Sequence, residues 1–67
     1  MKMMPVASSA ISAVGYDPAT HRMKIRFVHG DTYDFCRVPE AVFRGLLNAR
    51  SKGGFYNDHI RDRYPCH

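Results

Sequence analysis

The fold is decided by the stretch Arg22-Met23-Lys24-Ile25-Arg26-Phe27. Basic side chains at positions 22, 24 and 26 alternate with apolar side chains at positions 23, 25 and 27. This period of two is typical of a strand whose two faces meet different surroundings. The stretch therefore predicts a β-strand with one charged face and one apolar face.

The segments on either side of this strand also read as strands. After His29-Gly30-Asp31, which supplies a tight turn, side chains alternate again over residues 32–37, so the two stretches predict a β-hairpin. Before it, residues 9–16 alternate as well, and Asp17-Pro18 marks a turn. We expect three antiparallel strands.

The register of the hairpin decides the role of Tyr33 and Phe35. In one register Arg26 faces Phe35, and a mixed basic and aromatic face results on which bases could stack. In a register shifted by one residue, Ile25 and Phe27 share a face with the two rings and form a core under a helix. We favour the core arrangement because the apolar stripe of the helix then has something to cover.

Two helices are expected after the hairpin. The first spans about residues 39–48, with Pro39 at the first helical position and Glu40 in the first turn. Its apolar stripe consists of Val42, Phe43, Leu46 and Leu47. Residues 48–54 predict a flexible basic loop, and residues 55–64 a short helix that ends before Pro65.

These elements predict an α+β domain, with a three-stranded antiparallel sheet covered by one α-helix plus a short C-terminal helix. Residues 1–7 carry no pattern and are expected to be a flexible N-terminal tail ahead of a single domain at residues 8–67. The expected core consists of Val14, Ile25, Phe27, Phe35, Val42, Phe43, Leu46, Leu47 and Ile60.

Composition excludes several classes of protein. With 45% hydrophobic and 24% charged residues, disorder of the whole 67-residue chain is not expected. No apolar run approaches the roughly 20 residues of a membrane helix, and none of signal-peptide length follows the N-terminus. Two cysteines, Cys36 and Cys66, make no disulfide framework, so we expect free thiols, a cytoplasmic location and no membrane partner.

Positive charge is concentrated near the C-terminus. The chain has a formal net charge of +4. Residues 44–63 hold five Lys and Arg side chains against two aspartates. A basic stretch beside aromatic residues suits an anionic partner.

We expect this stretch to bind nucleic acid. Its candidate residues are Arg50, Lys52, Tyr56, Asn57, His59, Arg61 and Arg63. The cations would neutralise phosphates, Tyr56 would stack on a base, and Asn57 and His59 would form hydrogen bonds. Two alternatives remain open. In the first, the segment has only a structural role, as a loop that caps one helix and a second helix that covers the core, and its polar residues are solvated. In the second, the segment binds an acidic protein.

Signals for catalysis and cofactors are weak. His59 follows Asp58, but adjacent residues on a helix point about 100° apart and rarely cooperate. The chain has no pair of cysteines or histidines at zinc-binding spacing. Residues 51–54 lack the spacing of a phosphate-binding loop. We expect a non-enzymatic protein with no catalytic residue, no metal and no cofactor.

Residues 8–64 resemble the KTSC family, which is named for a domain at the C-terminus of some lysyl-tRNA synthetases and also occurs as standalone small bacterial proteins. The resemblance rests on Ser8-Ser9-Ala10-Ile11, Val14-Gly15-Tyr16-Asp17, Ile25, Phe27, Gly30, Tyr33-Asp34-Phe35, Val38-Pro39, Ser51-Lys52-Gly53, Phe55, Tyr56-Asn57, Ile60-Arg61 and Tyr64-Pro65. The central motif of the family is Tyr-x-Tyr. Here Phe35 replaces the second tyrosine, so a role of that hydroxyl is lost while packing or stacking is retained. The resemblance implies an α+β fold and suggests RNA as a partner.

Overall fold

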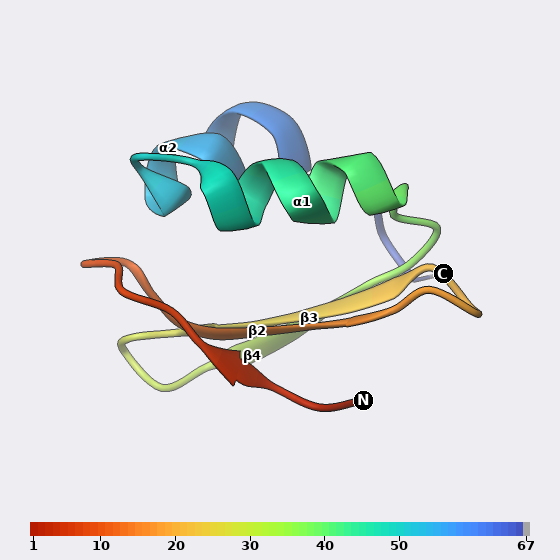
Figure 1. The fold of residues 1–67 in the computed structure, drawn as a ribbon, viewed down its shortest axis with the longest axis horizontal. Helices are drawn as coiled ribbons and strands as arrows, with labels where there is room; N and C mark the ends of the chain where they lie inside the picture. Colours follow the sequence, from red (N-terminus) through yellow and green to blue (C-terminus); the bar gives the residue numbers. More distant parts are fainter. Residues whose placement is uncertain (67) are drawn as a thin grey trace.

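Two helical segments lie over one face of a sheet in the computed structural model, which describes residues 1–66 (Figure 1). The strands are β1 (Met4–Pro5), β2 (Ile11–Asp17), β3 (Arg22–Phe27) and β4 (Thr32–Phe35), antiparallel and in that spatial order. The helices are α1 (Glu40–Asn48), α2 (Lys52–Phe55) and the π-helical turn η1 (Tyr56–Ile60). No helix within residues 1–66 has the length and hydropathy to span a membrane. The predicted α+β architecture is confirmed.

The sheet has four strands rather than the three expected. Met4 and Pro5 pair with Val14 and Ala13, so part of the predicted N-terminal tail belongs to the sheet. Gly15 permits this close approach, because a Cβ there would lie 2.9 Å from the Met3 sulfur. A two-residue strand is too short to produce an alternating pattern, which is why the sequence did not show it.

The hairpin adopts the core register. Met23 pairs with Phe35, and Ile25 pairs with Tyr33. Phe35 is buried, as are Met23 and Ile25, whereas Tyr33 keeps 47% of its surface exposed at the edge of the sheet. The turn closes at Gly30, whose φ of 110° favours glycine.

The core lies between the helices and the inner face of the sheet. Its buried members are Ile11, Val14, Met23, Ile25, Phe35, Val38, Phe43, Leu46 and Ile60, while Phe27, Val42 and Leu47 are partly buried against them. Every residue of the predicted core is therefore in or against it. The prediction missed Ile11 and Met23, which are buried on β2 and β3, and Val38, which lies outside any periodic element and whose backbone N–H donates to the His21 carbonyl at 2.8 Å.

The C-terminal helical segment begins and ends earlier than predicted. The expected flexible loop at residues 48–54 instead contains the start of α2, because the Ser51 hydroxyl accepts a hydrogen bond from the Gly54 N–H at 3.1 Å. The helical segment ends at Ile60, and Asp62 adopts a left-handed backbone with φ of 62°. Residues 61–63 therefore form a turn and not a further helical turn.

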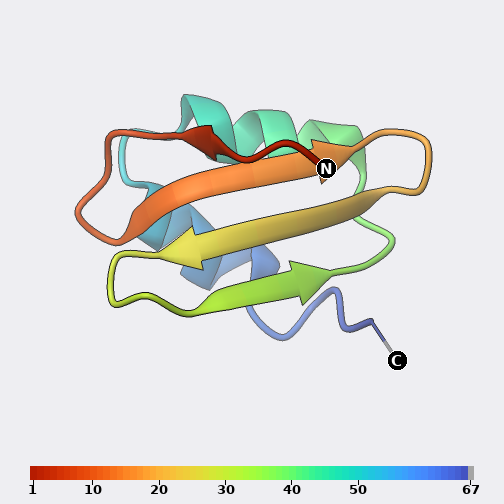
Figure 2. The same ribbon diagram turned by 90° about the horizontal axis from the view of Figure 1, so that it is seen from below.

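Cys36 and Cys66 form a disulfide bond, so the prediction of two free thiols is wrong. The chain after η1 folds back alongside the end of β4 (Figure 2). There the Cys36 N–H donates to the Tyr64 carbonyl at 3.0 Å, and the Cα atoms of the two cysteines lie 4.8 Å apart. The number and spacing of the cysteines could not show this, since only the return of the chain brings them together.

Candidate nucleic-acid interface

The predicted basic residues are spread along a short rod. Helices α2 and η1 follow one another directly over nine residues, a length of about 13 Å. Arg50 precedes this rod, and Arg61 and Arg63 follow it. All three side chains are exposed, so they are available to a ligand but do not form one compact cluster.

Lys52 does not face outward as a free cation. It is half-buried, and its Nζ donates a hydrogen bond to the Ala49 carbonyl at 3.2 Å. Ala49 is the C-cap of α1, where a cation stabilises the free carbonyls. The contact assigns Lys52 a capping role.

Tyr56 packs inward and is half-buried. Its ring meets Phe27 edge-on with centroids 5.0 Å apart, and Phe35 edge-on at 6.0 Å. Burial raises the pKa of its hydroxyl, although the nearby Arg61 acts in the opposite direction. The sequence predicted that Tyr56 stacks on a base, but its ring is partly occupied by packing on Phe27 and Phe35.

The remaining predicted residues lie at the surface. Asn57 and His59 are exposed on η1, and the His59 ring lies against Phe55 with centroids 4.5 Å apart. The Arg61 Nε lies 3.9 Å from a carboxylate oxygen of Asp62. Of the seven predicted residues, five are therefore exposed: Arg50, Asn57, His59, Arg61 and Arg63.

Two backbone N–H groups at the N-terminus of α2 are already engaged. The Gly54 N–H, which would face an anion, is bound to the Ser51 hydroxyl. The Phe55 N–H donates to the Ser51 carbonyl at 2.9 Å. These two groups therefore do not contribute to the phosphate-binding role suggested by the basic loop at a helix start.

The outer face of the sheet carries a second basic row that our sequence analysis did not assign. Arg22, Lys24 and Arg26 lie on β3, spaced by about 6.8 Å because alternate residues share a face. Lys24 is 3.8 Å from the Asp34 carboxylate, and the Arg26 Nε donates to the Thr32 hydroxyl at 3.5 Å. The alternation over residues 22–27 contained this signal.

A pocket of about 360 Å³ lies between β4 and the C-terminal tail, and we call it the aromatic pocket. It is lined by Tyr33, Asp34, Phe35, Tyr56, Asp62 and Tyr64, together with Pro65. The residues come from β4, η1 and the returning tail. None of the acidic residues was a predicted site residue, because only the disulfide-linked return of the chain brings Asp62 near β4.

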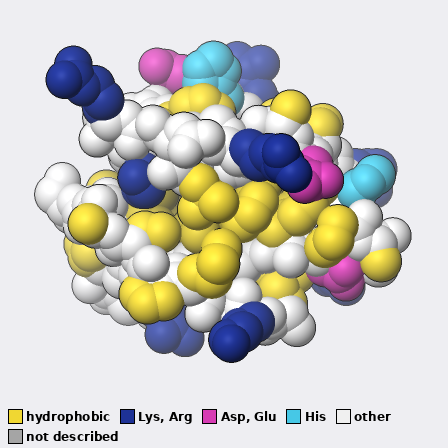
Figure 3. Space-filling model, viewed as in Figure 1, with side chains coloured by type: hydrophobic (Ala, Val, Ile, Leu, Met, Phe, Trp, Pro, Cys, Tyr) yellow, Lys and Arg dark blue, Asp and Glu magenta, His cyan; other side chains and the backbone are white. Residues whose placement is uncertain are grey.

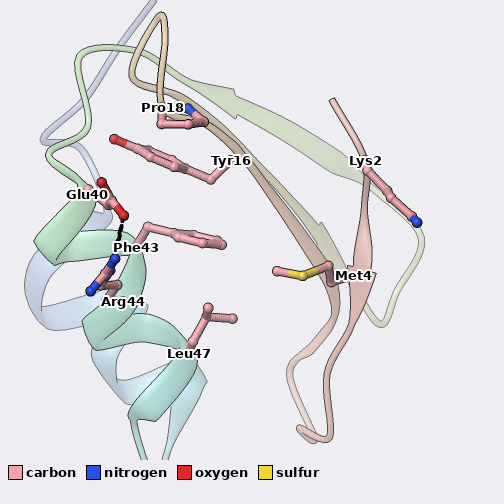
Figure 4. A pocket seen from close by; sticks show the side chains of 8 residues that line it. All are labelled: Lys2, Met4, Tyr16, Pro18, Glu40, Phe43, Arg44 and Leu47. Carbon is pink, nitrogen blue, oxygen red and sulfur yellow. Dashed lines mark hydrogen bonds and ion pairs between the residues drawn. The ribbon is translucent and has the colours of Figure 1, made fainter.

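A second hollow, the N-terminal groove, lies between β1 and α1 (Figure 4). Met4, Phe43 and Leu47 point into it from opposite sides, with Tyr16 stacked on Phe43 at 4.8 Å. Figure 3 shows hydrophobic side chains gathered along this seam between the helix layer and the sheet, with Lys and Arg side chains spread around it.

The charged residues of the N-terminal groove are largely paired. Arg44 and Glu40 form an ion pair at 2.8 Å across one turn of α1. The Tyr16 hydroxyl donates to the Val38 carbonyl at 2.6 Å. These contacts make the groove part of the packing between the helix and the edge of the sheet.

A family model described as the KTSC domain matches residues 7–64. The chain belongs to the KTSC domain family. A crystal structure of a KTSC domain protein from Yersinia pestis superposes with a TM-score of 0.92 at 34% identity, covering 96% of this chain and 90% of that one. The resemblance stated from the sequence is thus confirmed, together with the fold it implied.

Relatives among known proteins are of two sizes. A protein of Tsukamurella paurometabola is 48% identical over 62 residues, which are 92% of each chain. A lysine–tRNA ligase of Nostoc sp. is 34% identical over 56 residues, which are 84% of this chain and 10% of the ligase. Sequences similar to this chain therefore occur both as small proteins and as a small part of a much larger enzyme.

Proposed function

We propose that this KTSC domain is a non-enzymatic binding module for RNA, in single-stranded or structured form. Its contacts would be made by the exposed side chains of the C-terminal segment, namely Arg50, Asn57, His59, Arg61 and Arg63. The arginines would neutralise phosphates, and Asn57 and His59 would form hydrogen bonds with bases or sugars. The observation that carries the proposal is the exposure of all three arginines in this segment.

Two further points support it. A similar domain forms a tenth of a lysine–tRNA ligase, an enzyme whose name states that it acts on tRNA. The net charge of +4 also favours an anionic partner. RNA binding implies a cytoplasmic location, in which the bond between Cys36 and Cys66 would form only under oxidising conditions.

The mechanism predicts weak and unspecific binding. Three phosphate contacts give a slope of log K against log salt of about −2 for a single strand. Phosphate contacts position a partner without reading its sequence, so discrimination between sequences should be small. Since Tyr56 is held by Phe27 and Phe35, base stacking contributes less than an exposed ring would.

The test is the salt dependence of binding to a labelled single-stranded RNA, followed by fluorescence anisotropy in two charge-matched double variants. Arg61→Ala with Arg63→Ala removes two cations from the proposed interface. Arg22→Ala with Arg26→Ala removes two cations from the outer face of the sheet and serves as the control. We expect the first variant to reduce the slope to about −0.7 and the second to leave it unchanged.

Two results would contradict the proposal. Equal weakening in both variants would show that net charge and not this segment drives association. Unaltered binding in the first variant, with the fold intact by circular dichroism, would exclude the segment. Binding to an acidic protein through the same basic surface is the rival, and an absence of RNA binding at low salt with the fold intact would leave it ahead.

A further inference from the structure

The aromatic pocket has a chemistry opposite to that of the rest of the molecule. The chain carries a net positive charge, yet the charged residues that line this pocket are Asp34 and Asp62. The other walls are rings from β4, η1 and the tail. The Asp34 carboxylate lies beside Lys24 on the outer face, so Asp62 is the residue whose carboxylate lies beside the rings. Aromatic faces beside a carboxylate favour a cation over an anion or a neutral ligand.

The rings of the pocket are held in place before any ligand arrives. Tyr56 meets Phe27 and Phe35 edge-on, with interplanar angles of 74° and 71°. Tyr33 also meets Phe27 edge-on, with centroids 5.5 Å apart. Tyr33 nevertheless keeps 47% of its surface exposed, so part of a fixed ring remains open to a ligand. Fixed rings lower the entropic cost of binding.

The wall formed by the tail is fastened at three points. The Cys36 N–H binds the Tyr64 carbonyl at 3.0 Å, and the Arg37 Nη2 donates to the Pro65 carbonyl at 3.0 Å. The disulfide between Cys36 and Cys66 closes the same contact. The tail is therefore held beside β4, and the pocket between them has two fixed walls.

Hydrogen-bond acceptors face this space from both walls. The Phe27 N–H donates to the Asp31 carbonyl, so residues 33 and 35 form the hydrogen-bonded pairs with β3, and the carbonyl of Asp34 points away from β3. Across the pocket, Asp62 is a lining residue whose side chain is 93% exposed, so its carboxylate lies at the rim. A planar cation with several N–H groups can use both acceptors at once.

Three resident cations lie nearby and set the limit on affinity, and one of them, Arg37, is engaged by the Pro65 carbonyl. Lys24 contacts the Asp34 carboxylate at 3.8 Å, and Arg61 contacts the Asp62 carboxylate at 3.9 Å. Both distances are long and all four side chains are substantially exposed, so these pairs are weak. A ligand cation can therefore compete for Asp62, and binding should be modest.

From this arrangement we infer that the aromatic pocket binds a guanidinium group, with its plane against Tyr33 or Tyr64 and its N–H groups donating to the Asp34 carbonyl and the Asp62 carboxylate. Guanidinium suits the site better than ammonium because it is planar, stacks on rings and donates in a fork. The inference does not rest on RNA binding, since it uses a ligand of the opposite charge and the space between β4 and the tail, although Asp62 of the pocket adjoins Arg61 and Arg63.

The test is an NMR titration of the oxidised protein with Nα-acetyl-arginine methylamide, monitored at the backbone amides of residues 31–36 and 56–66. The matched probe is the citrulline compound, which has the same shape without the charge. We expect shifts confined to the pocket for the arginine probe, with an affinity at least fivefold higher than that of citrulline. Equal binding of both probes, or no shifts at any concentration, would overturn the inference.

Two variants that each replace one aspartate by asparagine test whether the Asp62 carboxylate binds the probe. Asp62→Asn removes the carboxylate, and asparagine tolerates the left-handed backbone, so the fold is retained. Asp58→Asn removes an exposed carboxylate of η1 outside the pocket lining and is the control. Asp62→Asn should lower the affinity for the arginine probe about fivefold, and Asp58→Asn should leave it unchanged. Equal effects in the two would reduce the interaction to general electrostatics and overturn the site.

Two further arms identify the source of the group. Acetyl-Gly-Arg-Gly-amide that binds at least tenfold more tightly than the single residue would indicate an arginine presented by a protein. Equal affinities would indicate a small free guanidinium compound. Either result supports the inference. Adenosine that binds the pocket more tightly than the arginine probe, and so displaces it, would instead make the pocket a nucleobase site. That result would contradict the inference.

Discussion

The two edges of the sheet are closed in different ways. At one edge, β1 has two residues, contains Pro5 and lies beside an apolar groove whose charged residues Glu40 and Arg44 pair with each other. At the other edge, β4 has four residues and is flanked by a disulfide-linked tail and an aromatic pocket. A short strand with proline blocks further pairing, whereas the β4 edge keeps acceptors free. The first edge is therefore structural, and the second is suited to a ligand.

The largest effect should come from the structural edge. Phe43 is 9% exposed and stacks on Tyr16, so Phe43→Ala should reduce the free energy of unfolding by about 3–5 kcal/mol. Chemical denaturation measures this loss, which would leave a domain of this size largely unfolded. Val28→Ala is the control, because Val28 is 55% exposed and should cost less than about 0.5 kcal/mol. A melting temperature unchanged by Phe43→Ala would show that Phe43 is not part of the core and that this edge is not structural.

The β4 edge should respond to reduction. The disulfide closes a loop with a sequence separation of 30 residues, so its reduction should lower the free energy of unfolding by about 2–4 kcal/mol. Denaturation with and without a phosphine reductant measures the difference. Cys66→Ser in the absence of reductant should reproduce it. Identical stability in both states would show that the tail is not fastened to β4 in solution.

A smaller effect is expected from the tyrosine of the N-terminal groove. Tyr16→Phe removes a hydroxyl that donates to the Val38 carbonyl, which should cost about 1–2 kcal/mol at neutral pH. Burial, followed by the charges of Glu40 and Asp17, raises the pKa of Tyr16. A raised pKa favours the neutral phenol in the folded state, so its contribution is present below pH 10 and is lost as pH rises through the folded pKa.

Stability measured between pH 8 and pH 12 tests this sign. The wild-type protein should lose stability above about pH 10, and Tyr16→Phe should lose less over the same range. Part of the loss should persist in the variant because burial also raises the pKa of Tyr56. A steeper loss in the variant than in the wild type would contradict the burial of the Tyr16 hydroxyl.

The sequence predicted the elements whose signal is periodic. The alternation at residues 22–27 predicted β3 correctly, and the apolar stripe at residues 42–47 predicted the helix α1 that covers the sheet. Burial on one face imposes both periods. β1 and Val38 were missed, since a two-residue strand and a single residue carry no period. Ile11 and Met23 were left out of the predicted core although they lie on predicted strands. The start of α2 was missed because the Ser51 cap outweighs the poor helix propensity of Gly53 and Gly54.

The candidate site was harder to predict than the fold. Charge counting found the exposed arginines, but it could not show that Lys52 caps α1 or that Tyr56 packs on Phe27. The aromatic pocket depends on the return of the tail to β4, which is a long-range contact without a local signal. Residues that act through such contacts are visible only once the fold is known.

RNA binding by the C-terminal segment is tested most directly by an NMR titration of the protein with a short single-stranded RNA and with tRNA at low salt. The account predicts shifts that are confined to residues 50–63 and largest at Arg50, Asn57, His59, Arg61 and Arg63, and that disappear as salt is raised. Shifts centred on Arg22, Lys24 and Arg26, or no shifts at any concentration with the fold intact, would contradict it.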